Sequence, residues 1–178
     1  IFFTNLNDRL QFINIHSGTN FANATGSPPQ AKYIAVVGDF VFLVHLKVGA
    51  TIYPRKWQHC AINDPTDWSI SGVSGDSDDQ EIPDGDELVG ILAMPGSNAR
   101  LFQRKARRQL VFSPGSNPVF QQIDMDAPSE GAATRGVIAP HAIVPIGSSS
   151  YIVLNETGWY LGDEFTPIGA ERVDVTFL

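Results

Sequence analysis

The stretch YPRKWQHCAINDPTDW at residues 53–68 decides the fold of this chain. An apolar and basic strand runs into Asn63, Asp64 and Pro65. Asn and Asp side chains hydrogen-bond their own backbone in turns, and Pro65 fixes its own φ angle and disfavours the helical region for Asp64. The stretch therefore predicts a turn that redirects a strand, and it contains no set of nucleophile, base or metal ligands.

Two tryptophans and the only cysteine lie beside this turn. Trp57 and Trp68 flank it, so we expect both to be buried and structural. Cys60 is the only cysteine, which makes an internal disulfide impossible. His59 precedes it, but neighbours on a strand point to opposite faces, so we do not expect a Cys–His nucleophile.

Short strands separated by turn signals are predicted along the rest of the chain. Helical periodicity is nearly absent, with one short helix expected near Gly169–Val173, and 16 Gly and 12 Pro are spread throughout. Gly158 supplies the positive φ that a hairpin loop needs. The sequence predicts an all-β chain with strands at Leu10–Ile15, Tyr33–Val37, Phe40–Leu46, Thr51–Gln58, Leu88–Ala93, Arg100–Gln103, Gln109–Phe112, Val119–Ile123, Ala142–Ile146, Tyr151–Leu154 and Gly158–Leu161.

Three segments share one plan, in which an apolar strand, a glycine turn and a second apolar strand follow one another. Their turns near Asp39, Ser97 and Ser149 recur about every fifty residues, which suits the four-stranded antiparallel blades of a β-propeller or partial propeller. A β-sandwich, whose strands are separated by turns in a similar way, is the alternative. We interpret the chain as one all-β domain or fragment with the first strands of an incomplete blade at 1–32, blades at 33–71, 88–128 and 129–178, and an acidic loop at 72–87.

The chain carries a formal net charge of −7, which argues against nucleic-acid binding by the whole surface. The longest apolar run, near Phe40–Leu46, is too short to span a bilayer, so we expect no membrane association. Three blades are few for a closed propeller, and the chain starts without Met and ends on apolar Leu178. We expect a fragment, or closure by neighbouring chains.

Three ordered motifs resemble a known group of proteins. They are W-x-x-C-x-I-N-D-P-T-D-W-S, Q-E-I-P-D-G-D-E-L-V-G-I and G-W-Y-L-G-D-x-x-x-P-I-G-x-E-R-V-D-x-T-F-L. In this order they resemble the propeller-like region of bacteriophage tail proteins, of the tail hub, nozzle or packaged-DNA stabilisation type of short-tailed phages. The resemblance covers roughly Tyr33 to Leu178 and rests on structural motifs.

This resemblance implies a structural component of a phage tail that acts through subunit assembly, with no enzyme activity and no cofactor. Its partners would be other copies of itself and other tail proteins, and no small-molecule substrate is expected. The location would be the virion, after synthesis in the bacterial cytoplasm. A carbohydrate-binding or carbohydrate-active propeller at a phage tail tip is the alternative, and a cellular scaffold propeller is a third hypothesis.

One basic cluster and one acidic segment are the charged features of the sequence. Arg104, Lys105, Arg107 and Arg108, with Arg100 nearby, form a possible anion contact, including non-specific contact with DNA phosphates. We favour an exposed hairpin tip that pairs with the acidic segment. The acidic segment, with Asp76, Asp78, Asp79, Asp84 and Asp86, lacks the spacing of a calcium loop, so we favour a solvated loop.

The remaining candidates also favour structural roles. His16, His45, His59 and His141 are far apart in sequence and predict no zinc site. Two carboxylates would suffice for a glycosidase, but no feature selects a pair from Asp64, Asp67, Glu156, Asp163 and Glu171. Arg172 lies in an alternating-charge segment and would pair with a carboxylate as a structural lock.

Overall fold

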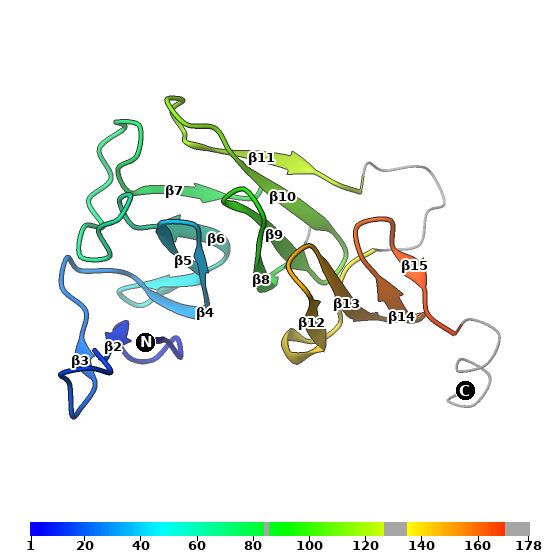
Figure 1. Cartoon of the computed structure of the whole chain (residues 1–178), viewed down its shortest axis with the longest axis horizontal. Coiled ribbons are helices and arrows are strands. Elements are labelled where there is room, and N and C mark those ends of the chain that lie inside the picture. Colours follow the sequence, from blue (N-terminus) through cyan, green and yellow to red (C-terminus); the bar gives the residue numbers. More distant parts are fainter. Residues whose placement is uncertain (84–85, 127–134, 170–178) are drawn as a thin grey trace.

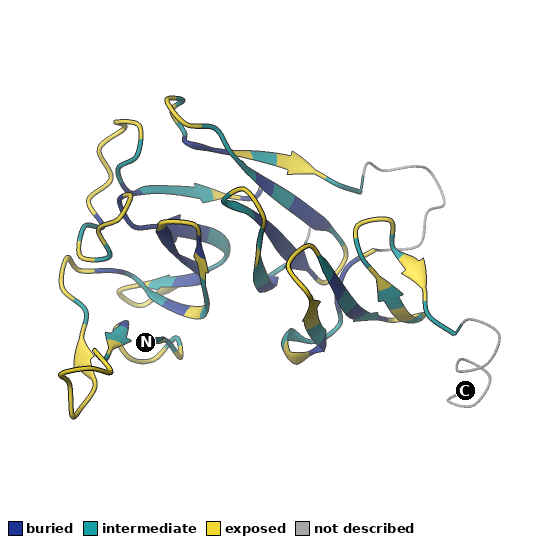
Figure 2. Ribbon diagram, viewed as in Figure 1, coloured by how far each residue is buried: buried dark blue, intermediate teal, exposed yellow. Residues whose placement is uncertain are grey.

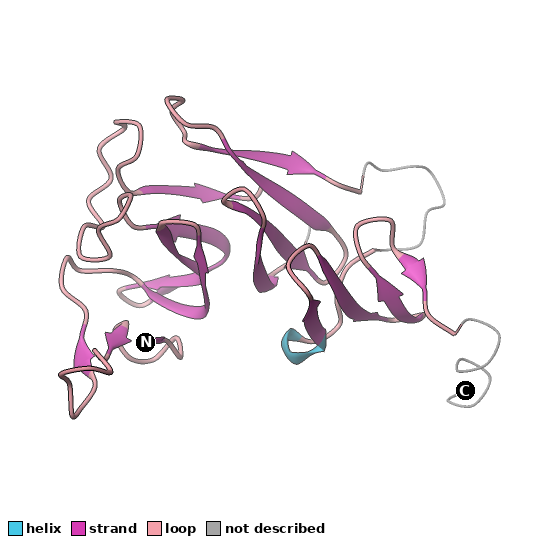
Figure 3. Ribbon diagram, in the orientation of Figure 1, coloured by secondary structure: helices cyan, strands magenta, loops and turns pink. Residues whose placement is uncertain are grey.

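The structure is a computed structural model that describes residues 1–83, 86–126 and 135–169, and it is all-β apart from one turn of 3-10 helix (Figures 1 and 3). Three consecutive four-stranded antiparallel sheets follow a small three-stranded sheet at the N-terminus. Within each four-stranded sheet, neighbouring strands are consecutive in the chain. We call these four-stranded sheets the first, second and third blades.

The strand bounds agree with most of the predicted ranges. The first blade holds β4 (Gln30–Val37), β5 (Phe40–Val48), β6 (Thr51–His59) and β7 (Asp78–Glu81). The second blade holds β8 (Leu88–Met94), β9 (Asn98–Gln103), β10 (Arg107–Phe112) and β11 (Phe120–Asp124). The third blade holds β12 (Ile143–Ile146), β13 (Ser150–Asn155), β14 (Gly158–Leu161) and β15 (Thr166–Pro167).

The acidic segment is not entirely a loop, and the interpretation of 72–87 is wrong for Asp78–Glu81. These residues form β7, which pairs antiparallel with β6 and completes the first blade. Their composition disfavours a strand, but two cross-strand ion pairs, Lys56–Asp79 and Arg55–Glu81, compensate along this edge.

The N-terminal region forms a sheet of its own. Its strands are β1 (Phe2–Phe3), β2 (Gln11–Phe12) and β3 (Ala22–Asn23), so the expected strand at Leu10–Ile15 is reduced to two residues. The 3-10 helix η1 (Pro140–Ala142) precedes β12 and is not predicted by the sequence. The short helix predicted near Gly169–Val173 lies outside the described residues except for Gly169. Among the described residues, no helix is long and apolar enough to cross a membrane.

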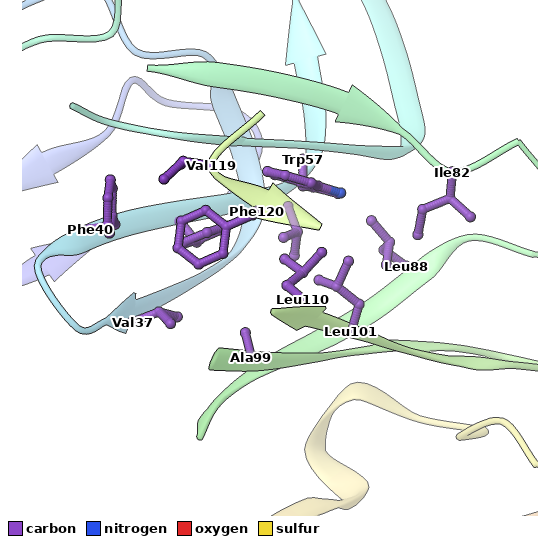
Figure 4. Close-up of a cluster of buried hydrophobic side chains, with 12 residues drawn as sticks. Val37, Phe40, Trp57, Ile82, Leu88, Ala99, Leu101, Leu110, Val119 and Phe120 are labelled. Atoms are coloured by element: carbon purple, nitrogen blue, oxygen red, sulfur yellow. The ribbon is translucent and has the colours of Figure 1, made fainter. Parts of the chain in front are cut away.

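The blades pack face to face, because alternate residues of each central strand point to opposite neighbours. Phe40, Phe42 and Val44 of β5 face the second blade, where they join one core cluster with Leu101 of β9 and Phe120 of β11. Figure 4 shows Phe40, Leu101 and Phe120 in this cluster. The intervening β5 residues Val41 and Leu43 belong to a different core, which packs under the N-terminal sheet.

The second blade repeats this pattern. Ala99 and Leu101 of β9 face the first blade, whereas Phe102 faces Tyr151 and Val153 of the third. A row of sheets that each cover the next has the layering of propeller blades, and a two-layer sandwich would not place one sheet between two others. The described part therefore has the arrangement of a partial propeller, with the outer strands β7, β11 and β15 on its rim (Figure 1).

Candidate functional site

The Asn-Asp-Pro turn has the geometry that its residues predict. The Asp64 carboxylate accepts hydrogen bonds from the backbone N–H of Thr66 at 2.9 Å and from its hydroxyl at 2.6 Å. These hydrogen bonds lower the pKa of Asp64. Asn63 adopts a φ of +56°, and its N–H donates to the carbonyl of Asp39 in the β4–β5 turn at 2.9 Å. The turn is thus attached to the hairpin of the first blade.

Both tryptophans are buried, as predicted. The indole N–H of Trp68 donates to the carbonyl of Pro65 at 2.9 Å and so braces the turn from within. The indole N–H of Trp57 donates to Gln122 of β11 at 3.2 Å and so joins the first blade to the second. Gly26 approaches the same turn from the N-terminal region, with a φ of +77°. A Cβ at Gly26 would lie 1.7 Å from the carbonyl oxygen of Thr66.

His59 and Cys60 do not form a nucleophile–base pair. The His59 ring lies among the rings of Phe40, Phe42 and Phe120, and burial lowers its pKa. The Cys60 sulfur accepts the N–H of Val41, and burial raises the pKa of the thiol. A buried, protonated thiol is inert as a nucleophile.

The interpretation of Arg107 and Arg108 as a possible anion contact is wrong, because both side chains are buried. The guanidinium of Arg107 forms an ion pair with Asp126 at 2.8 Å and donates to the Tyr151 hydroxyl at 2.9 Å. It also donates to the backbone carbonyls of Gly162 and Asp163. Arg108 pairs with Asp124 at 3.6 Å. A buried guanidinium needs several acceptors at once, and for Arg107 they come from Tyr151 of β13 and from the segments that follow β11 and β14.

Arg100 completes a polar junction between the second and third blades. Its guanidinium donates two hydrogen bonds to the carboxylate of Asp163, at 3.0 and 2.6 Å. The Tyr151 hydroxyl donates to the same carboxylate at 2.9 Å. The bonds from Arg100 lower the pKa of Asp163, whereas burial raises the pKa of Tyr151 to about 12. We call Arg100, Arg107, Asp126, Tyr151 and Asp163 the arginine junction.

Arg104 and Lys105 are the two predicted anion contacts that remain exposed. Arg104 pairs with Glu87 at 2.8 Å, and Lys105 lies 3.9 Å from Asp86. Partial burial opposes ionisation of Glu87, but the hydrogen bond and charge of Arg104 lower its pKa overall. The expected pairing between the hairpin tip and the acidic segment is therefore confirmed for Asp86 and Glu87, at the C-terminal end of the acidic segment.

A further polar cluster, not predicted from the sequence, lies where β5 meets β8. His45 sits at a β-bulge with a φ of +57°, and its Nδ1 lies 3.2 Å from the Leu88 carbonyl and 3.6 Å from the Glu87 carboxylate. Burial lowers the pKa of His45. The Tyr33 ring meets the His45 ring edge-on. The only sequence signal is that His45 interrupts an apolar strand.

A cavity of about 280 Å³ lies near this cluster, where the first strands of the three blades converge. Its walls are polar and apolar in about equal measure and include Tyr33 of β4, Gly90 of β8 and Ile143 of β12. The polar side chains among its lining residues are those of Thr4, Lys32 and Tyr33. The cavity thus lies between the blades, at the strands β4, β8 and β12.

The other candidate side chains are held in local structure. Asp67 accepts the N–H of Ser69 in a turn, and Asp76 is hydrogen-bonded by Ser71. Glu156 lies exposed in the β13–β14 turn, which Gly158 closes at a φ of +139°. Within the described ranges, no three His, Cys, Asp or Glu side chains gather as a metal site. Asp84, Glu171 and Arg172 lie outside these ranges.

No protein-family model and no curated protein matches the chain.

Proposed function

We propose that the chain is a structural component of a bacteriophage tail, of the tail hub, nozzle or packaged-DNA stabilisation type, and that it acts through subunit assembly. The proposal rests on the observation that the buried arginine and tyrosine side chains, which could serve chemistry, serve as contacts between blades. Arg100, Arg107 and Tyr151 are all engaged in holding one blade against the next. The described residues of the motifs that resemble tail proteins also build turns and packing contacts, such as the Asp64 turn and the buried Trp57 and Trp68, and a scaffold requires such contacts.

The candidate reactive groups support the same role. His59 and Cys60 are buried in cores, and burial moves both pKa values away from the ranges that favour acid–base or nucleophilic chemistry. Asp163, which a glycosidase hypothesis would need free, is occupied by Arg100 and Tyr151. A protein that acts through its interfaces needs such groups only for packing and for contacts between blades, and His59, Cys60 and Asp163 have these roles.

Contact with DNA is a minor part of the proposal. Arg104 and Lys105 are exposed at the β9–β10 hairpin, but Glu87 and Asp86 lie beside them. Their charges are partly compensated, so a phosphate contact here would be weak and sensitive to salt. The main partners are other copies of the chain and other tail proteins.

The test is to purify virions of the phage whose genome encodes the chain and to analyse them by quantitative mass spectrometry. We expect the chain at a fixed copy number per virion, and gold-labelled antibodies should bind at the tail in electron micrographs. Labelling with pre-immune serum provides the control. Absence of the chain from purified virions would overturn the proposal, as would sugar release from the host surface polysaccharide by the purified chain.

A further inference from the structure

The contact between the first and second blades encloses an ionisable side chain. His59, the last residue of β6, is 0% exposed. The centroid of its ring lies 5.1 Å from that of Phe40, 5.3 Å from that of Phe42 and 5.2 Å from that of Phe120. The first two rings belong to β5 of the first blade, and Phe120 belongs to β11 of the second. Figure 2 shows buried residues on β5 and on the second-blade strands β9 and β10. His59 is therefore held between the two blades.

The closed contact holds the ring of His59 in its neutral form. Its Nδ1 lies 2.7 Å from the carbonyl oxygen of Cys60, so Nδ1 carries the hydrogen and donates it. Its Nε2 is buried and has no hydrogen-bond partner among the described residues. A charged ring would carry a second N–H at this position without an acceptor, and burying such a cation is costly. Attraction of a cation to ring faces recovers only part of the lost hydration.

One carboxylate faces this ring from the neighbouring strand. Asp78 of β7 is the direct cross-strand partner of His59. Burial lowers the pKa of His59 overall, against smaller opposing effects of the Cys60 carbonyl and the Asp78 charge. The Asp78 carboxylate already accepts the N–H of Asp79 at 2.9 Å and the side-chain amide of Gln80 at 3.3 Å. The other strands packed on the ring, β5 and β11, face it with phenylalanines.

We propose that His59 is a proton-sensitive switch, and that mild acid opens the contact between the first and second blades by protonating it. In an open state the ring meets water and binds a proton at about pH 6.5. The closed contact resists that proton, so each pH unit below about 6.5 raises the ratio of open to closed molecules by up to about tenfold. The stabilisation that neutral His59 contributes is thus present above this pH and is lost as the pH falls. Such a switch acts within one chain, beyond the proposed role in assembly.

Two hydrogen bonds that cross the same contact do not respond to mild acid. The indole N–H of Trp57 donates to the side-chain carbonyl of Gln122 at 3.2 Å. The side-chain amide of Gln80 donates to the carbonyl of Phe120 at 3.4 Å. Each joins the first blade to the second, and neither amides nor indoles gain a proton in this range. The Trp57 hydrogen bond therefore reports whether the contact is open without itself being a sensor.

The pH range separates this switch from the arginine junction and from the other buried histidine. Arg100 holds the pKa of Asp163 below its ordinary value, so their ion pair persists in mild acid. His45 is buried as well, and burial lowers its pKa. Its Nδ1 lies 3.6 Å from the Glu87 carboxylate, so a charged His45 would gain an ion-pair partner. Protonation of His59 provides no such partner at Nε2.

The experiment is hydrogen exchange of the tryptophan indole N–H groups, followed by NMR on the 178-residue chain in neutral and mildly acidic solution. Dividing each rate by that of free tryptophan at the same pH gives an opening constant. The opening constant of the Trp57 indole should rise at least about tenfold as the pH falls from about 6.5 to about 4.5. The Trp68 indole donates to Pro65 within one turn, so it is the internal control and should keep a constant value.

Two variants locate the sensor. His59→Phe keeps an aromatic ring among the others but cannot bind a proton, so the rise at Trp57 should disappear. His45→Asn is the matched control, because Asn tolerates the positive φ of this position, and it should keep the rise. Circular dichroism confirms that each variant is folded, and His59→Leu replaces His59→Phe if that variant unfolds.

Any of four results would overturn the switch. The first is a Trp57 opening constant that does not change with pH in the wild type. The second is a His59→Phe variant that keeps the rise, and the third is a His45→Asn variant that loses it, which would make His45 the sensor. The fourth is a Trp68 opening constant that rises in parallel, because the first blade would then unfold as a whole.

Discussion

The guanidinium of Arg107 in the second blade donates a 2.9 Å hydrogen bond to the hydroxyl of Tyr151 in the third. Both side chains are fully buried. The Tyr151 hydroxyl in turn donates a hydrogen bond to Asp163, which Arg100 holds from the second blade. The two blades are therefore joined by one continuous hydrogen-bonded chain as well as by apolar contacts.

Replacing Arg107 by Ala should destabilise the fold strongly. The change removes the fully buried guanidinium and leaves the Asp126 carboxylate only its longer pair with Arg135 at 4.0 Å, and breaking a buried pair in this way costs about 3–5 kcal/mol. Urea denaturation followed by tryptophan fluorescence measures the free energy of unfolding. Arg104→Ala is the control, because the Arg104 pair is exposed, and it should have a much smaller effect. Equal losses in the two variants would contradict the assignment of Arg107 as a buried anchor.

Trp68→Ala should lower the free energy of unfolding by about 3–5 kcal/mol, since truncating a buried aromatic side chain leaves a cavity. It also removes the hydrogen bond to Pro65. Trp159→Ala is the matched control, because that side chain is partly exposed. Similar melting temperatures for the two variants would argue against a structural role for Trp68.

Gly26→Ala should detach the N-terminal segment from the Asn-Asp-Pro turn. The new Cβ would overlap the carbonyl oxygen of Thr66, in addition to the about 1–2 kcal/mol that a left-handed conformation costs a residue with a Cβ. Gly49→Ala isolates the second effect, because Gly49 has a φ of +61° and open space around it. We expect faster tryptic cleavage after Arg9 in the Gly26 variant alone. Matching cleavage rates in the two variants would show that the close approach is unimportant.

Stability should fall as the pH rises from about 10 to about 12. Tyr151 has a pKa of about 12 in the folded chain against an ordinary value of 10.0, so between these values the unfolded chain loses a proton that the folded chain keeps. The stabilisation that protonated Tyr151 contributes is fully present below pH 10. Between pH 10 and about 12 it is lost at about 1.4 kcal/mol per pH unit. Denaturation curves of the wild type and Tyr151→Phe should converge over this range. A constant difference between them would contradict the raised pKa.

DNA binding should be weak and insensitive to sequence. Arg104 and Lys105 are the exposed basic residues of the β9–β10 hairpin, and both lie next to carboxylates. Fluorescence anisotropy with two unrelated duplexes should show similar affinities at low salt and loss of binding at physiological salt. Arg104→Ala with Lys105→Ala should reduce the low-salt signal. Tight binding that persists at physiological salt and distinguishes the duplexes would contradict the scaffold role.

The strands could be predicted where turn chemistry and apolar runs coincide, as at β5, whose apolar run begins at Phe40 directly after the turn at Asp39. β7 could not, because Asp78 to Glu81 become a strand only through pairing with β6. The burial of Arg107 could not be predicted either, since its partners Asp126 and Tyr151 are distant in the sequence. The positive φ of His45 depends on a bulge that forms only after β5 and β6 have paired.

The two junctions within the row differ in composition, and this sets the order in which the molecule opens. The contact between the first and second blades is built from aromatic rings such as those of Phe42 and Phe120, and it involves a larger cluster of apolar side chains. The arginine junction relies on ionised groups, so alkali loosens it while leaving the aromatic contact intact. Local opening proceeds through cooperative units of unequal stability. We therefore expect the amide hydrogens of the third blade to exchange first, and those of the first and second blades to exchange more slowly.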